Sequence, residues 1–104
     1  MYARIVTARP KPDMVEEATR TLETQILPLL NARKGFREAY WMTPGDDEAV
    51  AISFWDSQED AEAYAQDDGP RVMSLMANLT EGTPQIKGYD VIVSTAKKAS
   101  VSGA

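Results

Sequence analysis

Residues 49–55, with the sequence AVAISFW, carry apolar side chains at both odd and even positions. The segment is short, contains β-branched and aromatic residues, and follows the turn signal PGDD at residues 44–47, so we predict a β-strand. Successive side chains of a strand point to opposite faces of its sheet. A sheet that contains this strand therefore needs apolar cover on both faces.

Strand and helix signals alternate along the rest of the chain. Asp13 is expected to cap the first helix, and Pro28 is expected to kink it or end it near Leu27. The EGTP stretch at 81–84 is expected to form a loop before the last strand. The predicted strands are 2–8, 36–43, 48–55 and 85–95, and the predicted helices are 13–32, 57–66 and 70–79.

The order strand–helix–strand–strand–helix–strand predicts an α+β, ferredoxin-like fold with a four-stranded antiparallel sheet and helices on one face. We expect one domain, residues 1–95, and a flexible tail, residues 96–104. Because residues 49–55 and the run Val91-Ile92-Val93 make both sheet faces apolar, we expect a second copy to cover the free face. The prediction is a homodimer through the sheet faces, and a monomer with a moderately apolar sheet is the alternative.

Composition excludes several classes of function. The formal net charge of −5 argues against nucleic acid or an anionic membrane as a partner. The chain contains no cysteine and no histidine, which removes disulfides, thiolate metal sites and the usual general base. Residues 1–6 contain no long apolar core or cleavage pattern, and no transmembrane run follows. We therefore expect a soluble protein of the cytoplasm.

The acidic cluster after residues 49–55 has two interpretations. Ser57 and Asp60 have the spacing of a capping box, with carboxylates near the positive end of a helix dipole. A carboxylate metal site is the alternative, although no second acidic cluster has a matching spacing. On the helix that follows, Tyr64 shares a face with Ala61 and Ala65, so we expect its side chain to point toward the sheet.

Several motifs together resemble a known family. LPLL at 27–30 ends a long helix, Gly35-Phe36 opens a strand, FWDSQEDA at 54–61 precedes Tyr64, and YDVI lies at 89–92. Over about residues 1–95, the chain resembles the antibiotic biosynthesis monooxygenase family of the dimeric α+β barrel superfamily. The resemblance implies a ferredoxin-like dimer. Its members include quinone-forming monooxygenases, haem-degrading monooxygenases and many proteins of unknown role.

The haem-degrading members are marked by a tryptophan, a histidine and an asparagine. In this chain those positions fall on Tyr64, near Ser74 and near Arg4, so all three depart from the pattern. The resemblance to quinone-forming members implies no metal, flavin or other cofactor. In these members an aromatic phenol or anthrone loses a proton, and its electron-rich anion reacts directly with oxygen.

The resemblance implies a pocket between sheet and helices, and the chain offers residues for it. We expect Tyr64 and Arg71 to be catalytic, although neither is an obvious base. Tyr64 could equally be a core residue, Trp55 a packing residue, and Arg71 a partner of Asp67 or Asp68. Tyr40 and Trp41 point to opposite faces, so only one of them should line a given pocket. The expected substrate-binding residues are Arg4, Tyr40, Ala51, Ser53, Trp55 and Asn78.

Three functions are compatible with these features. The first is a cofactor-independent monooxygenase acting on a small aromatic or quinol-like substrate. The second is a module that binds a small hydrophobic or aromatic molecule without turnover. The third is a structural dimer, for which a solid core would be expected.

Overall fold

The structure of the protein, a computed structural model, describes residues 1–45 and 48–95. The predicted tail, 96–104, and part of the predicted turn, residues 46–47, lie outside them. Four strands form one antiparallel sheet in the order β2-β3-β1-β4. Their bounds are β1 (Tyr2–Pro10), β2 (Phe36–Met42), β3 (Ala49–Trp55) and β4 (Thr80–Asp90).

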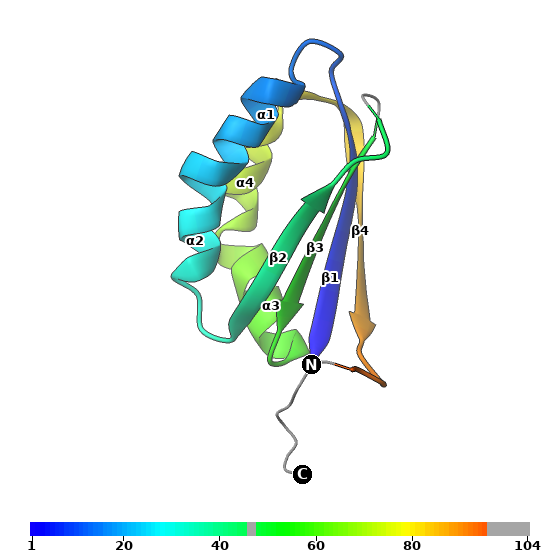
Figure 1. Ribbon diagram of the computed structural model, residues 1–104. Coiled ribbons are helices and arrows are strands. Elements are labelled where there is room, and N and C mark those ends of the chain that lie inside the picture. Colours follow the sequence, from blue (N-terminus) through cyan, green and yellow to red (C-terminus); the bar gives the residue numbers. More distant parts are fainter. Residues whose placement is uncertain (46–47, 96–104) are drawn as a thin grey trace.

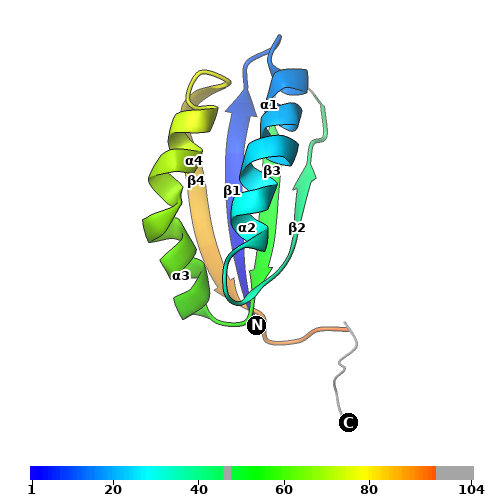
Figure 2. The same cartoon turned by 90° about the vertical axis from the view of Figure 1, so that its left-hand side faces the viewer.

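The helices lie on one face of this sheet and form two rods (Figure 1). The first rod contains α1 (Val15–Thr21), the π-helix η1 (Leu22–Ile26) and α2 (Leu27–Asn31). The second contains α3 (Gln58–Asp67) and α4 (Gly69–Met76). The two rods lie side by side over the sheet, and both run roughly along the direction of the strands (Figure 2). The predicted α+β ferredoxin-like fold is thereby confirmed.

The first rod differs from its prediction at two points. Met14 is the N-cap residue of α1 and makes no side-chain capping bond, so the prediction of a cap at Asp13 is wrong. Pro28 does not end the helix, which continues to Asn31. Proline lacks the N–H that would bond one turn back, and its ring crowds that turn. The wider turns of η1, which precede it directly, provide the space for this ring.

The start of α3 settles the role of the acidic cluster. Ser57 is the N-cap residue, and its Oγ accepts a hydrogen bond from the backbone N–H of Asp60 at 3.2 Å. Asp56 pairs with Nε of Arg37 at 2.7 Å. Within the described residues, no group of three or more His, Cys, Asp or Glu side chains could hold a metal ion. The capping interpretation is therefore the one that the structure supports.

The last strand lies further toward the amino terminus than predicted. The EGTP stretch at 81–84 belongs to β4, because Glu81 and Thr80 pair with Arg9 and Pro10 across a register shift in β1. Pro84 lies at this register shift and has no direct partner in β1, and prolines of edge strands occur at such irregularities. The strand ends at Asp90, opposite Tyr2, and the N–H of Val91 makes one further backbone bond, to the carbonyl oxygen of Met1 at 2.9 Å. The expectation that the run 91–93 makes a sheet face apolar is wrong, and Ile92 is 90% exposed.

The core lies between the first rod, β3 and α3. It consists of Ile26, Leu30, Trp55, Ala61 and Tyr64. The Trp55 side chain is completely buried, and its ring meets Phe36 edge-on at 5.4 Å between centroids. Packing of Trp55 at the end of β3 therefore ties the sheet to both rods.

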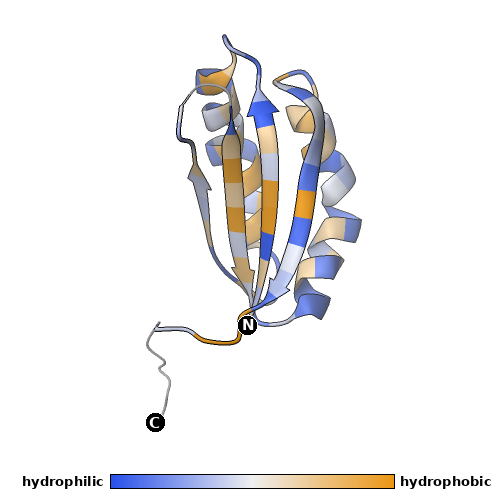
Figure 3. Cartoon of the chain, turned by 90° about the vertical axis from the view of Figure 1, so that its right-hand side faces the viewer, coloured by the Kyte–Doolittle hydropathy of each residue, from blue (hydrophilic) through white to orange (hydrophobic). Residues whose placement is uncertain are grey.

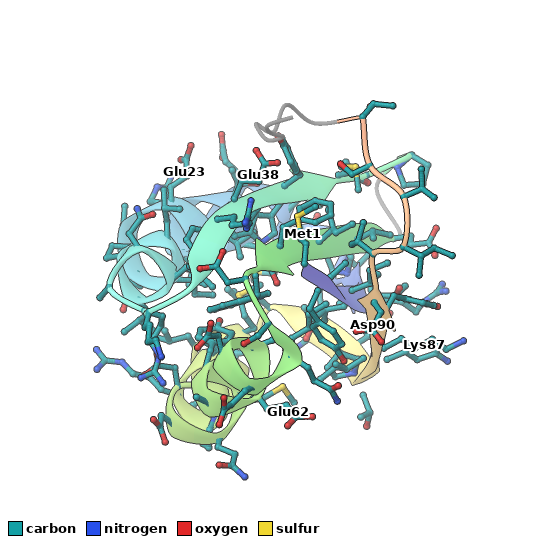
Figure 4. The ribbon with its side chains drawn as sticks, turned by 90° about the horizontal axis from the view of Figure 1, so that it is seen from below. Met1, Glu23, Glu38, Glu62, Lys87 and Asp90 are labelled. Atoms are coloured by element: carbon teal, nitrogen blue, oxygen red, sulfur yellow. The ribbon has the colours of Figure 1, made fainter. Side chains whose placement is uncertain are left out.

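The face of the sheet opposite the helices is apolar at its centre. Residues that pair directly across antiparallel strands point to the same face, so Ile5, Ile52 and Tyr40 share it. Figure 3 shows this face without a helix over it. Toward the edge, Lys87 points away from the helices (Figure 4). The face also carries Val50, Phe54, Met42 and Tyr89.

Candidate active site

A cavity of about 360 Å³ lies between the helices and the sheet. Its size falls within the range of sites that bind small molecules. Side chains of β1, β2 and β3 form one wall, and those of α1, η1 and α4 form the other. Small side chains on the three strands leave the room that larger ones would fill, namely Ala8, Ala39, Ala49 and Ala51. Most of the lining is apolar, so the cavity suits a hydrophobic guest.

Three polar side chains meet at one end of this cavity. Arg4 and Ser53 are direct partners in the pairing of β1 with β3, and both face the cavity. The Arg4 guanidinium carbon lies 5.6 Å from the ring centre of Tyr64 on α3. Behind them, the buried Nε1–H of Trp55 donates to Ser53 Oγ at 2.9 Å. Ser53 Oγ in turn donates a long hydrogen bond to the backbone carbonyl oxygen of Arg4 at 3.5 Å.

Burial sets the electrostatics of this polar end. It lowers the pKa of the Arg4 guanidinium, against the opposing effect of Tyr64 and Tyr2. Burial also raises the pKa of the Tyr64 hydroxyl, which Arg4 opposes and Asp68 reinforces. Burial is the larger cause of both pKa shifts. The Arg4 cation therefore has too little negative charge nearby to offset its loss of water.

Four of the eight predicted site residues line the cavity. These are Arg4, Ala51, Ser53 and Tyr64. Trp55 lies behind the wall and supports Ser53 from the core. The structure thus brings together the residues of β1, β3 and α3.

The other three predicted residues do not line the cavity. Tyr40 faces the opposite side of the sheet, is 49% exposed, and donates to Oε1 of Glu38 at 2.9 Å. Trp41, the next residue, lines the cavity instead. Arg71 and Asn78 are exposed and are absent from the cavity wall. Their roles in substrate binding or catalysis stay predictions.

The family of the chain can be decided by sequence. The family model described as antibiotic biosynthesis monooxygenase matches residues 1–72, which is more than half of the chain. The chain belongs to the antibiotic biosynthesis monooxygenase family. A comparison with curated proteins gave no match.

Several solved structures share the fold of this chain. A monooxygenase from the gene ActVA-Orf6 of Streptomyces coelicolor, in complex with nanaomycin D, superposes with a TM-score of 0.77 at 14% identity, covering 89% of this chain and 88% of that one. A variant of SnoaB, a cofactor-independent oxygenase from Streptomyces nogalater, gives 0.72 at 13% identity, covering 91% and 96%. A protein of unknown function from Nitrosomonas europaea gives 0.74 at 20% identity, covering 89% and 90%.

In some members of the antibiotic biosynthesis monooxygenase family, a tryptophan, a histidine and an asparagine mark haem degradation. Ser74, near the expected histidine position, is exposed and does not line the cavity. Tyr64 and Arg4, at the other two positions, contact each other across the polar end. The cavity therefore presents donors for an oxygen atom of a guest, and the lining described here includes no histidine.

Sequence reasoning missed the helical wall of the cavity. Val15 and Leu22 of the first rod line it, as do Val72, Met73 and Met76 of the second. An apolar helix face has the same spacing whether it contacts other side chains or an empty space, so the sequence carries no signal for this difference.

Across the described parts of the chain, no helix is long and apolar enough to cross a membrane.

Proposed function

We propose that the protein is a cofactor-independent monooxygenase that oxidises a small aromatic or quinol-like substrate with molecular oxygen. The observation that carries this proposal is the cavity, which is apolar over most of its wall and has Arg4, Ser53 and Tyr64 at one end. Membership of the family supports the reaction type. The proposed substrate is flat enough to lie between the small strand residues and the helices.

Each residue of the polar end has a proposed task. Arg4 stabilises negative charge on a substrate oxygen, where donors in a dry cavity act most strongly. The Ser53 hydroxyl assists by turning from the Arg4 carbonyl oxygen toward the substrate oxygen. Tyr64 and Trp41 lie against the aromatic rings of the substrate. The apolar wall excludes water from the oxygen adduct. Ala51 leaves the space in which the rings bind.

The reaction can be written for an anthrone. The methylene carbon of the anthrone loses a proton, which gives an enolate with its negative charge on the carbonyl oxygen. This anion donates electrons to O₂, which binds at the former methylene carbon. One oxygen atom becomes the new carbonyl and the other leaves as water, so the anthrone and O₂ give an anthraquinone and H₂O. The substrate itself supplies all of the electrons.

We also propose that the protein works as a homodimer in the cytoplasm. The apolar outer face of the sheet, centred on Ile5 and Ile52, supports sheet-to-sheet pairing. Such pairing would leave both cavities on the helical sides of the dimer. Gel filtration and the cellular location of a fluorescent fusion test these two statements.

Oxygen uptake tests the proposed reaction. Dithranol, a dihydroxyanthrone, is added to the protein in the presence of a metal chelator, and its spontaneous oxidation is subtracted. We expect uptake well above that background. Ala51→Phe should abolish the excess because its ring occupies the cavity, whereas Val50→Phe, on the opposite face of the same strand, should retain it. Equal rates with and without protein would contradict the proposal.

A second candidate function is binding without turnover. It is favoured by the absence of any carboxylate or imidazole among the described cavity residues, since such a group would be the ordinary base. Thermal stabilisation by a dihydroxyanthraquinone, without oxygen uptake from dithranol, would support this function. The third possibility, a purely structural dimer, predicted a solid core, and the open cavity argues against it.

A further inference from the structure

The cavity extends well beyond its polar end. On β1, the residues that line it run from Arg4 through Val6 and Ala8 to Pro10. A strand rises about 3.3 Å per residue, so these steps cover roughly 20 Å. β1 ends and α1 begins at the same end of the molecule (Figure 1). We call the part of the cavity at this end the far section, and its walls include Ala8, Pro10, Val15, Ala18 and Ala49.

The far section is apolar even where threonines lie beside it. Thr19 and Thr80 each donate through Oγ1 to a backbone carbonyl oxygen four residues earlier, at 2.9 and 3.1 Å. Thr43 Oγ1 donates to the carbonyl oxygen of Glu48 at 2.5 Å. The protons of these three hydroxyls are therefore already used within the protein. Among the lining residues that the structure describes, Arg4 alone is charged, and it lies at the opposite end.

The two ends of the cavity differ in their access to solvent. At the polar end, Ser53 is 8% exposed and Tyr64 is 4% exposed. Beside the far section, the lining residues Thr43 and 82–84 are at least partly exposed, and 82–84 have no direct partners in β1. The cavity is thus closed at the polar end and open at the far section. A guest whose oxygen reaches Arg4 therefore has its other end in the far section.

The walls of the far section favour an apolar substituent of the guest. Water beside apolar side chains is released when a hydrophobic group replaces it, and this release favours binding. A ring system at the polar end covers the nearer residues, such as Val6 and Ala51, and leaves the far section to its substituent. Because a volume of about 360 Å³ is spread over the length of the cavity, the cavity is narrow on average. A narrow section suits a chain better than further rings.

We propose that the substrate carries an apolar hydrocarbon chain, which lies in the far section while the aromatic ring lies at the polar end. This inference rests on the proposed function and narrows its substrate class to aromatic compounds with a chain opposite the oxygen that meets Arg4. Ala8 and Ala49, which pair across β1 and β3, determine this specificity. A larger side chain at either position would occupy the path of the chain.

The length of the chain follows from the geometry of β1. Three single bonds of an extended chain advance about as far as one strand residue, roughly 3.3–3.6 Å. The residues from Ala8 to Pro10 therefore match a chain of roughly six to nine carbons. A longer chain passes through the opening into solvent and should gain no further contact.

The experiment measures the binding of 4-alkyl-1-naphthols by isothermal titration calorimetry, under argon so that no oxidation occurs. The chain at C4 points away from the hydroxyl at C1 and is methyl, hexyl, nonyl or dodecyl. Kd should fall roughly two- to fourfold for each added methylene, and so at least about thirtyfold from methyl to hexyl. Kd should then stay constant from nonyl to dodecyl. A chain of hexyl length that contains two ether oxygens should lose most of the gain, because the far section offers them no free donor.

Two variants at neighbouring residues of β3 locate the chain. Ala49→Phe places a ring in the far section, so the Kd values of the methyl and hexyl compounds should become nearly equal. Val50→Phe is the matched control, because Val50 points to the opposite face of the sheet and should leave the wild-type ratio unchanged. Circular dichroism checks that both variants fold, and the wild-type series decides by itself if Ala49→Phe does not.

The outcomes separate this inference from the proposed function. Equal Kd values for the methyl and hexyl compounds in wild type overturn the chain inference, as does a gain that continues to dodecyl or that persists in folded Ala49→Phe. Oxygen uptake from dithranol would still support the monooxygenase proposal in that case. A gain that stops near nonyl, without oxygen uptake from dithranol, supports the chain inference and contradicts turnover.

Discussion

Tyr64 joins the core to the cavity. Its ring lies 5.3 Å from that of Trp55 on one side and faces Arg4 on the other. The hydroxyl is kept neutral mainly by burial, which raises its pKa. This shift has a consequence for stability at alkaline pH.

The unfolded chain ionises Tyr64 at the ordinary tyrosine pKa, while the folded protein resists ionisation to a higher pH. The stabilisation linked to this group is therefore fully present below the unfolded pKa and is lost as pH rises through the folded pKa. We predict that Tyr64→Phe flattens the alkaline fall in the free energy of unfolding, measured by urea denaturation at a series of pH values.

The exposed Tyr89 provides the control for this experiment. Tyr89→Phe should leave the alkaline fall as in wild type. Identical pH profiles for Tyr64→Phe and wild type would show that burial of Tyr64 does not control the titration.

At the residue scale, strand periodicity predicted part of the site. Alternation along β3 placed Ala51 and Ser53 on one face, and the structure puts both on the cavity wall. The same rule separated Tyr40 from Trp41 but could not say which of them faces the helices. Arg71 shows the limit for helices, because a position one residue from Val72 is turned by about 100° around the axis. Such a rotation is set by packing against the sheet, which a local pattern does not contain.

At the scale of elements, the loop between α2 and β2 depends on a glycine. Gly35 has φ of +81°, and an added Cβ would collide with the carboxylate of Asp60 on α3. Its carbonyl oxygen also accepts the backbone N–H of Asp56 at 2.8 Å. The first rod, β2 and the start of α3 thus meet at a position that excludes side chains.

We predict that Gly35→Ala destabilises the protein by about 1–3 kcal/mol, because it combines backbone strain with a steric clash. Gly69→Ala is the matched control: Gly69 starts α4, and an added Cβ there meets nothing within 4 Å. Its change should stay within about 0.5 kcal/mol. Chemical denaturation measures both, and equal effects would contradict the role given to Gly35.

Element order was predictable from the sequence, whereas the limits of β4 were not. Hydrophobic periodicity and turn residues are local signals, and they located each helix and each strand to within a few residues, apart from β4. The start of β4 depends on Pro10 and Arg9 of β1, which lie some seventy residues earlier and offer backbone partners. Pro84 and Gly82 are breakers by local rules and are tolerated because both lie at the register shift of an edge strand, where neither pairs with β1.

At the scale of the whole molecule, the helices cover one face of the sheet and leave the other bare. The bare face has Ile5 and Ile52 at its centre, and Tyr40 and Met42 are each about half exposed. An apolar face of this kind commonly marks an interface between proteins. A twofold pairing of two sheets would bury it in both copies.

We predict that the wild-type protein is a dimer by light scattering at micromolar concentration. Ile52→Glu should give a folded monomer, because pairing would bury an uncompensated charge at the centre of the interface. Glu59→Lys changes an exposed charge on α3 and should leave the dimer intact. A monomeric wild-type protein would contradict the sheet-to-sheet arrangement.

The cavity lies on the helical side of the sheet. The central claim is that an aromatic molecule binds in this cavity, with one of its oxygen atoms at the polar end formed by Arg4, Ser53 and Tyr64. A crystal structure of the protein with 1,8-dihydroxyanthraquinone, a stable product-like compound, tests this claim most directly. We predict ring density between Ala51 and the helices, with one oxygen within hydrogen-bond distance of the Arg4 guanidinium. An empty cavity in crystals grown with saturating compound, or density on the bare face of the sheet alone, would contradict it.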